Sequence, residues 1–192
     1  MEHDRTLQFT PVDHPDARVR RIGFDLIDPY VEQCWSAVIG PSSTLLLRRL
    51  PTLWDTGVPA KIAAGELSRS LGLGAGVGER SRLASTLERI VTFGLARPGS
   101  DDAGLDVYRQ IPPLTQRQLA RLPEWTRAAE ERLLGAHLTQ VDDSSRHRAN
   151  VGTTAGARVA GTEAIEVKYG ELPRTVNVTA GAVDAASKGF RT

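Results

Sequence analysis

Residues 81–93 read SRLASTLERIVTF, and the fold predicted for the whole chain depends on this stretch. Apolar side chains recur in it at the spacing i, i+4, i+7 and i+8, which places them on one face of a helix. These apolar residues are Leu83, Leu87, Ile90 and Val91. A second face carries short hydroxyls and guanidiniums, at Arg82, Ser85, Thr86 and Arg89. Such groups fit base edges and phosphates in the major groove of DNA, so the stretch has the pattern of a recognition helix, which it shares with ordinary surface helices.

The segments on either side of this helix predict a second helix and two strands. Residues 64–73 place Leu67 and Leu71 toward a core, and Gly72 suits the left-handed backbone that ends a helix. After Gly94, residues 95–97 and 105–111 are suited to strands, and turn-forming residues fill positions 98–104. The predicted order is therefore helix, turn, helix, strand, turn and strand.

Residues 64–73, AGELSRSLGL, resemble the second helix of the winged helix-turn-helix superfamily, in which an xELAxxLGL pattern recurs. Ser68 takes the place of the usual alanine, and the turn at 74–78 is longer than in a minimal helix-turn-helix. In that family the following helix enters the major groove, and a β-hairpin wing touches the backbone or the minor groove beside it. The resemblance covers about residues 28–138. It implies a mainly α fold with a small β-hairpin (α+β), a winged helix-turn-helix with flanking N- and C-terminal helices.

The resemblance implies a sequence-specific double-stranded DNA-binding protein, a transcriptional regulator, with its recognition helix at 81–93 and its wing at 95–111. The polar face of the helix is expected on base edges, the helix start on a nearby phosphate, and the wing strands on the backbone. Asp101 and Asp102 at the wing tip repel phosphates, so we do not expect this tip deep in a groove. The candidate DNA-binding residues are Arg80, Ser81, Arg82, Ser85, Thr86, Arg89, Arg97 and Arg109.

An alternative function belongs to a different class. Residues 30–50, with Trp35 and the break at Ile39-Gly40-Pro41, are loosely similar to the N-terminal winged-helix region of primosomal replication proteins. This similarity implies a winged-helix protein-interaction module in a replication or nucleoid-associated assembly. The acidic wing tip and the net charge of only +1 favour it. The excess of basic residues between Lys61 and Arg97, six against three acidic ones, favours DNA.

The sequence predicts neither catalysis nor a bound cofactor. Four histidines occur without an H-x-x-x-H or H-E-x-x-H pair, and no G-x-S-x-G is present. The glycines at 72–78 form neither G-x-G-x-x-G nor G-K-[ST], which argues against a nucleotide site. The single cysteine, Cys34, excludes an internal disulfide and a multi-cysteine zinc site, and its place in an apolar set suggests packing. We therefore predict no metal, no cofactor and no enzyme activity.

The composition also predicts the cellular location of the protein and the segments into which the chain divides. No apolar run is long enough to span a membrane and no secretory signal is visible, which predicts a cytoplasmic protein. Residues 1–24 are polar and carry Pro11 and Pro15, so they are expected to form a flexible N-terminal arm. Residues 25–138 are expected to form the winged helix-turn-helix domain. Residues 139–192, rich in Gly, Ala, Thr, Ser and Val, are expected to be a mostly disordered tail, with alternation that allows a short hairpin at 163–179.

Helices are predicted on both sides of the central motif. Asp28-Pro29 marks one start, a second helix is expected from 42 to about 50, and Pro51 is expected to end or kink it. Thr115 and Gln118 form a capping box, and after Pro123 a helix is expected to reach about 138. Its apolar residues are Trp125, Ala129, Leu133 and Leu134. This stripe either closes the core of the same chain or pairs with a second copy, which would give a homodimer through helices 115–138.

Overall fold

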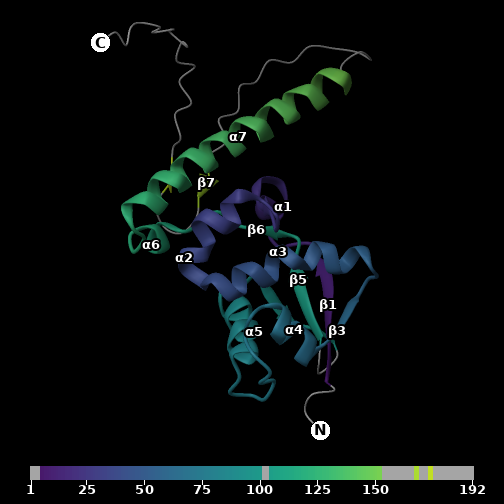
Figure 1. The fold of residues 1–192 in the computed structure, drawn as a ribbon. Coiled ribbons are helices and arrows are strands. Elements are labelled where there is room, and N and C mark those ends of the chain that lie inside the picture. Colours follow the sequence, from purple (N-terminus) through teal and green to yellow (C-terminus); the bar gives the residue numbers. More distant parts are fainter. Residues whose placement is uncertain (1–4, 101–103, 153–166, 169–172, 175–192) are drawn as a thin grey trace, which may run out of the picture.

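The computed structural model describes residues 5–100, 104–152, 167–168 and 173–174, and it combines helices with a small sheet (Figure 1). Four strands form the main sheet in the order β3-β1-β5-β4. They are β1 (Thr6–Val12), β3 (Ala60–Ala63), β4 (Ala96–Pro98) and β5 (Gly104–Tyr108). Strand β1 pairs antiparallel with β3 and parallel with β5, and β4 pairs antiparallel with β5. A second pair joins β2 (Phe24–Asp25) to β6 (Gln110–Ile111).

The prediction of a flexible N-terminal arm at residues 1–24 is wrong for the residues of this range that the structure describes. Strand β1 lies in the middle of the sheet with Leu7 and Phe9 buried, and α1 (Ala17–Ile22) buries Val19 and Ile22. The alternation of buried and more exposed residues along β1 is typical of a strand with one face on the core. The N-terminal segment is therefore part of the fold, and the sheet is larger than the predicted hairpin.

Helices cover this sheet and continue beyond it (Figure 1). They are η2 (Val31–Trp35, a π-helix), α2 (Ser36–Ile39), α3 (Pro41–Asp55), α4 (Ala64–Ser70), α5 (Arg82–Thr92), α6 (Gln116–Leu119) and α7 (Glu124–Gly152). The ends of α4 and α6 confirm two predictions, since Gly72 has a φ of +72° and the capping box of Thr115 and Gln118 is formed. Pro51 does not end α3, which continues to Asp55. A proline inside a helix removes one backbone hydrogen bond, and here the buried apolar side of α3 outweighs that loss.

A buried polar network attaches α7 to the rest of the core. The hydroxyl of Tyr30 donates a hydrogen bond to Glu130 Oε1 (3.2 Å) and accepts one from the backbone N–H of Leu114 (2.9 Å). The ring of Tyr30 stacks on Phe24 with centroids 3.8 Å apart. Both Tyr30 and Glu130 are almost fully buried, so these bonds satisfy polar groups that have little access to water.

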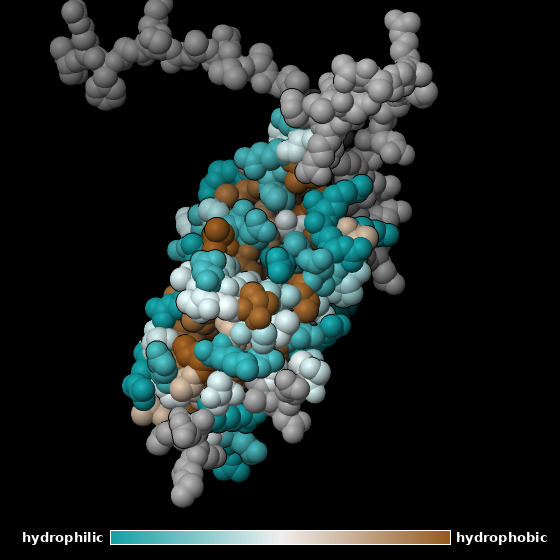
Figure 2. Space-filling model, turned by 90° about the vertical axis from the view of Figure 1, so that its right-hand side faces the viewer, coloured by the Kyte–Doolittle hydropathy of each residue, from teal (hydrophilic) through white to brown (hydrophobic). Residues whose placement is uncertain are grey.

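The apolar stripe of α7 closes the core of its own chain, because Ala129 and Leu134 are buried in it. Trp125 does not belong to this stripe: it is 69% exposed. Among the described residues, the other exposed large apolar side chains are Ile27, Leu45, Val58 and Phe93, and they come from different segments. Figure 2 likewise shows apolar residues dispersed in small groups over the face that it draws. Within the described residues, no helix is both long enough and apolar enough to cross a bilayer.

The end of the predicted domain at 138 is also wrong, because α7 continues to Gly152. Within this extension Arg146 pairs with Asp142 at 2.6 Å, an i,i+4 pair that supports a helix. Strands β7 (Val167–Lys168) and β8 (Pro173–Arg174) pair antiparallel inside the range expected for a hairpin. The remainder of the predicted tail, and with it the expected disorder, lies outside the described residues, as do Asp101 and Asp102.

Candidate functional site

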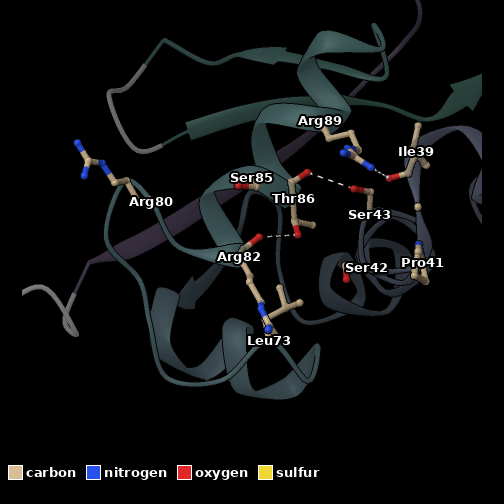
Figure 3. A pocket seen from close by; sticks show the side chains of 11 residues that line it. Ile39, Pro41, Ser42, Ser43, Leu73, Arg80, Arg82, Ser85, Thr86 and Arg89 are labelled. Atoms are coloured by element: carbon tan, nitrogen blue, oxygen red, sulfur yellow. Dashed lines mark hydrogen bonds between the residues drawn. The ribbon is translucent and has the colours of Figure 1, made fainter.

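An open hollow of about 260 Å³ lies between the start of α3 and the exposed face of α5 (Figure 3). Its lining combines guanidiniums and hydroxyls from these two helices and from the loop before α5. The polar residues of the lining are Arg80, Arg82, Arg89, Ser42, Ser43, Ser85 and Thr86. No carboxylate lines the hollow, so its chemistry is that of an anion-binding surface.

Helix α5 presents its basic residues on one face because its other face is fixed in the core. Ser81 is the N-cap, and its hydroxyl accepts a hydrogen bond from the N–H of Ala84 (3.1 Å). Leu83 and Ile90 are buried and set the rotation of the helix. Arg82 and Arg89 are seven residues apart, which brings them within about 20° of each other around the axis and separates them by about 10 Å along it. Both are exposed, as the sequence pattern predicted.

Thr86 was expected on the outer face, and this prediction is wrong. It is 6% exposed, and its hydroxyl donates a hydrogen bond to the carbonyl of Arg82 (2.8 Å). Its own carbonyl lies 3.4 Å from the hydroxyl of Ser43, on α3. Thr86 therefore belongs to the contact between α3 and α5, and only the edge of its side chain reaches the hollow. Ser85, one residue earlier, is exposed and remains available.

Arg89 lies against the bend at Gly40, where α2 ends and α3 begins. Its Nη1 is 3.5 Å from the carbonyl oxygen of Ile39, and Figure 3 shows the side chain turned toward that residue. Gly40 makes room for it: a Cβ on Gly40 would lie 3.2 Å from Nη1. Gly40 also has a φ of +79°, a backbone region that favours glycine. This glycine therefore allows both the sharp entry into α3 and the close approach of the guanidinium.

The arginines of the hollow carry uncompensated charge. In the described part of the chain, ion pairs are formed by residues such as Arg48, Arg97 and Arg146, but none involves Arg80, Arg82 or Arg89. No cluster of His, Cys, Asp or Glu suited to a metal ion is found within the same residues. Three guanidiniums without a carboxylate partner suit the binding of phosphate groups.

The other predicted arginines lie apart from Arg82 and Arg89, although Arg80 still lines the edge of the hollow. Figure 3 shows the side chain of Arg80 pointing away from those of Arg82 and Arg89. Arg97, on β4, forms an ion pair with Asp106 on β5 at 3.0 Å. Arg109 is exposed just after β5, and its N–H donates to the carbonyl of Val12, at the end of β5 opposite Gly104. Neither Arg97 nor Arg109 lines the hollow.

The contribution of α3 was missed by sequence reasoning. Gly40 and Pro41 stand directly before Ser42 and Ser43, and a glycine followed by a proline indicates that a new helix begins there. It does not show which part of the chain that helix start meets. The partner is α5, more than forty residues later, and only the folded structure brings the two together.

A second hollow of about 560 Å³ lies behind α5, near the start of β1. Its apolar lining includes Leu7, Leu83 and Leu87, and its charged residues have both signs: Arg5, Glu79 and Glu88. It therefore lacks the uniform positive charge of the hollow between α3 and α5.

No protein-family model, no curated protein and no solved structure matches this chain. We therefore infer the function from the residues that line the hollow between α3 and α5.

Proposed function

We propose that this protein binds double-stranded DNA sequence-specifically, as a transcriptional regulator, with α5 in the major groove. The observation that carries this proposal is the outer face of α5, where Arg82, Ser85 and Arg89 are exposed and the two guanidiniums have no carboxylate partner among the described residues. Arginine pairs bidentately with guanine, and serine hydroxyls accept or donate at several base edges. A single face with these groups can read a short sequence.

The arrangement of elements supports a winged helix-turn-helix. Helix α4, the glycine-bearing loop, α5 and the antiparallel strands β4 and β5 follow one another in the order that the sequence resemblance implies. In this assignment α5 is the recognition helix and residues 95–111 are the wing. One feature differs from a free hairpin: β5 also pairs with β1, so the wing is the edge of a four-stranded sheet.

Selection of bound fragments from random double-stranded DNA, followed by electrophoretic shifts of the enriched sequence across a range of salt, tests this proposal. About five phosphate contacts predict a log–log slope of −4 to −5 for affinity against salt. Arg82→Ala is expected to weaken binding of the enriched sequence by about 1–3 kcal/mol. Arg117→Ala removes the same charge from an exposed position of α6 that does not line the hollow, and serves as the control. Failure to enrich any sequence would contradict the proposal.

A second candidate function is a winged-helix protein-interaction module in a replication or nucleoid-associated assembly. The ion pair of Arg97 with Asp106 favours it, because it neutralises a wing cation that a DNA contact would require. This module predicts weak, sequence-independent DNA binding that Arg82→Ala does not change. The same electrophoretic measurements therefore separate the two functions.

A further inference from the structure

We propose that the two arginines of α5 have different roles: Arg89 and the start of α3 hold one phosphodiester group of the DNA backbone, whereas Arg82 reads a base edge. This inference rests on the proposed function and goes beyond it, because it assigns the hollow between α3 and α5 to the backbone of one DNA strand.

The two side chains share a face of α5 but differ in their surroundings. The Arg89 guanidinium lies against Ile39 and Gly40, with Nη1 3.5 Å from the Ile39 carbonyl oxygen. The Arg82 side chain has no hydrogen bond or ion pair within the described part of the chain, and Figure 3 shows it turned toward Leu73, away from Arg89. A guanidinium held by a neighbouring helix has a restricted reach, while one without such contacts can follow a base edge.

The groups around Arg89 complete a site for a singly charged phosphodiester. Ser42 lines the hollow, and the first intrahelical bond of α3 runs from the N–H of Thr44 to the carbonyl of Gly40 (3.2 Å). The N–H groups of Ser42 and Ser43 precede that bond, so neither has a partner within the helix. No side chain caps α3, because the N-cap is Gly40. The guanidinium fork of Arg89 provides the fixed charge, and these two N–H groups provide further donors to the same oxygens.

The position of each arginine along α5 agrees with its proposed role. Arg82 is the first residue of α5, and residues near the start of a recognition helix are those that contact base edges. Arg89 lies two turns later, where α3 borders the helix. A helix that flanks the recognition helix meets the wall of the groove, where the phosphates are. The occupant of the hollow is therefore a phosphate of the strand that α5 reads.

The salt dependence of DNA binding separates these two roles. The full chain is titrated with a fluorescent 20-base-pair duplex of random sequence and with a duplex of the enriched sequence. Arg89→Ala is expected to weaken binding to both duplexes by the same factor and to reduce the log–log salt slope by about 1. Arg89→Lys retains the charge and is expected to retain the slope. Arg82→Ala is expected to weaken binding to the enriched duplex by at least tenfold more than binding to the random duplex.

Arg117→Ala again controls for the loss of one positive charge. If Arg89→Ala changes the slope no more than Arg117→Ala does, the backbone role of Arg89 is wrong, although the protein still binds DNA. If Arg89→Ala lowers the preference for the enriched sequence instead of binding to both duplexes, Arg89 reads a base and the assignment is reversed.

A second measurement needs no DNA. Amide NMR spectra of the ¹⁵N-labelled chain are recorded while sodium phosphate replaces sodium chloride at constant ionic strength. The N–H signals of Ser42 and Ser43 are expected to shift in the natural chain and not in Arg89→Ala, whose folded spectrum also confirms its structure. Absence of these shifts would overturn the phosphate site. Shifts without any DNA binding would contradict the proposed function and leave an anion site in place.

Discussion

The guanidinium of Arg97 lies 3.0 Å from the carboxylate of Asp106, across the two strands that would form the wing. This pair leaves the outer edge of the sheet with little net charge, although Arg97 is a residue that the sequence suggested for a phosphate contact. The Arg97 side chain is 57% exposed, so water screens the pair and its contribution to stability is small. The main consequence of this ion pair is therefore that it weakens the binding of anions at this edge of the sheet.

The first prediction follows from this pair. Asp106→Asn removes the carboxylate and leaves Arg97 free, so the substitution should tighten DNA binding and steepen its salt slope by up to about 1. The stability of the fold should change by less than about 1 kcal/mol. Fluorescence anisotropy against salt measures the first effect and urea unfolding the second. Glu131→Gln, at an exposed position of α7, makes the same change in net charge. Equal effects of the two substitutions would show that β4 and β5 do not contact DNA.

The second prediction concerns the central strand. Phe9 is fully buried on β1 between two partner strands, so Phe9→Ala should lower the free energy of unfolding by about 3–5 kcal/mol. Thr6→Ala, on the same strand but exposed, should change it by less than about 0.5 kcal/mol. Urea unfolding followed by tryptophan fluorescence provides both values. A flexible N-terminal arm would instead give two equally small effects.

The third prediction uses the reactivity of the single cysteine. Burial, together with the nearby carboxylate of Glu130, raises the pKa of the Cys34 thiol to about 12, and the side chain is fully buried. Since the thiolate is the reactive form, labelling by an aromatic disulfide at pH 8 should be about 10³-fold slower than for an unfolded cysteine, whose pKa is near 8.5. Labelling of the chain in guanidinium chloride provides the reference rate. Rapid labelling of the folded chain would contradict the burial of Cys34 under α7.

The same pKa difference fixes the direction of a pH effect on stability. Between about pH 9 and pH 12 an unfolded Cys34 has lost its proton, whereas the folded thiol retains it. The unfolded state then binds fewer protons, so the free energy of unfolding contributed by this group falls as pH rises through that window. Burial also raises the pKa of Tyr30, which acts in the same direction at the alkaline end.

Local sequence signals predicted much of the helical structure. The capping box at Thr115, the stop at Gly72 and the apolar stripe around Leu83 each depend on residues within a few positions of one another. Their physical causes are local hydrogen bonds and the period of a helix, so they can be read without knowledge of the fold.

Long-range contacts explain what the sequence did not predict. Strand β1 is stabilised by β5, which lies nearly a hundred residues later, and Pro11 within the strand obscures its short alternation. Thr86 borders the apolar face of α5, and only the contact with α3 decides that it is buried. The neutralisation of Arg97 depends on the register of β4 against β5. In each case the outcome depends on a partner that no local pattern specifies.

The neighbouring residues Ser85 and Thr86 give the last prediction, because the structure places them on opposite sides of the boundary between surface and core. Thr86→Val keeps the shape of a buried side chain that bonds only to its own helix, so DNA affinity should stay within about twofold and stability within about 1.5 kcal/mol. Ser85→Ala removes an exposed hydroxyl from the middle of the α5 face that is proposed to contact bases. The free energy of unfolding should therefore stay unchanged, and the preference for the enriched sequence should fall by about 1 kcal/mol or more. Parallel binding titrations on the enriched and random duplexes measure both effects. A loss of preference in Thr86→Val alone would mean that α5 meets DNA with a different face from the one that is exposed here.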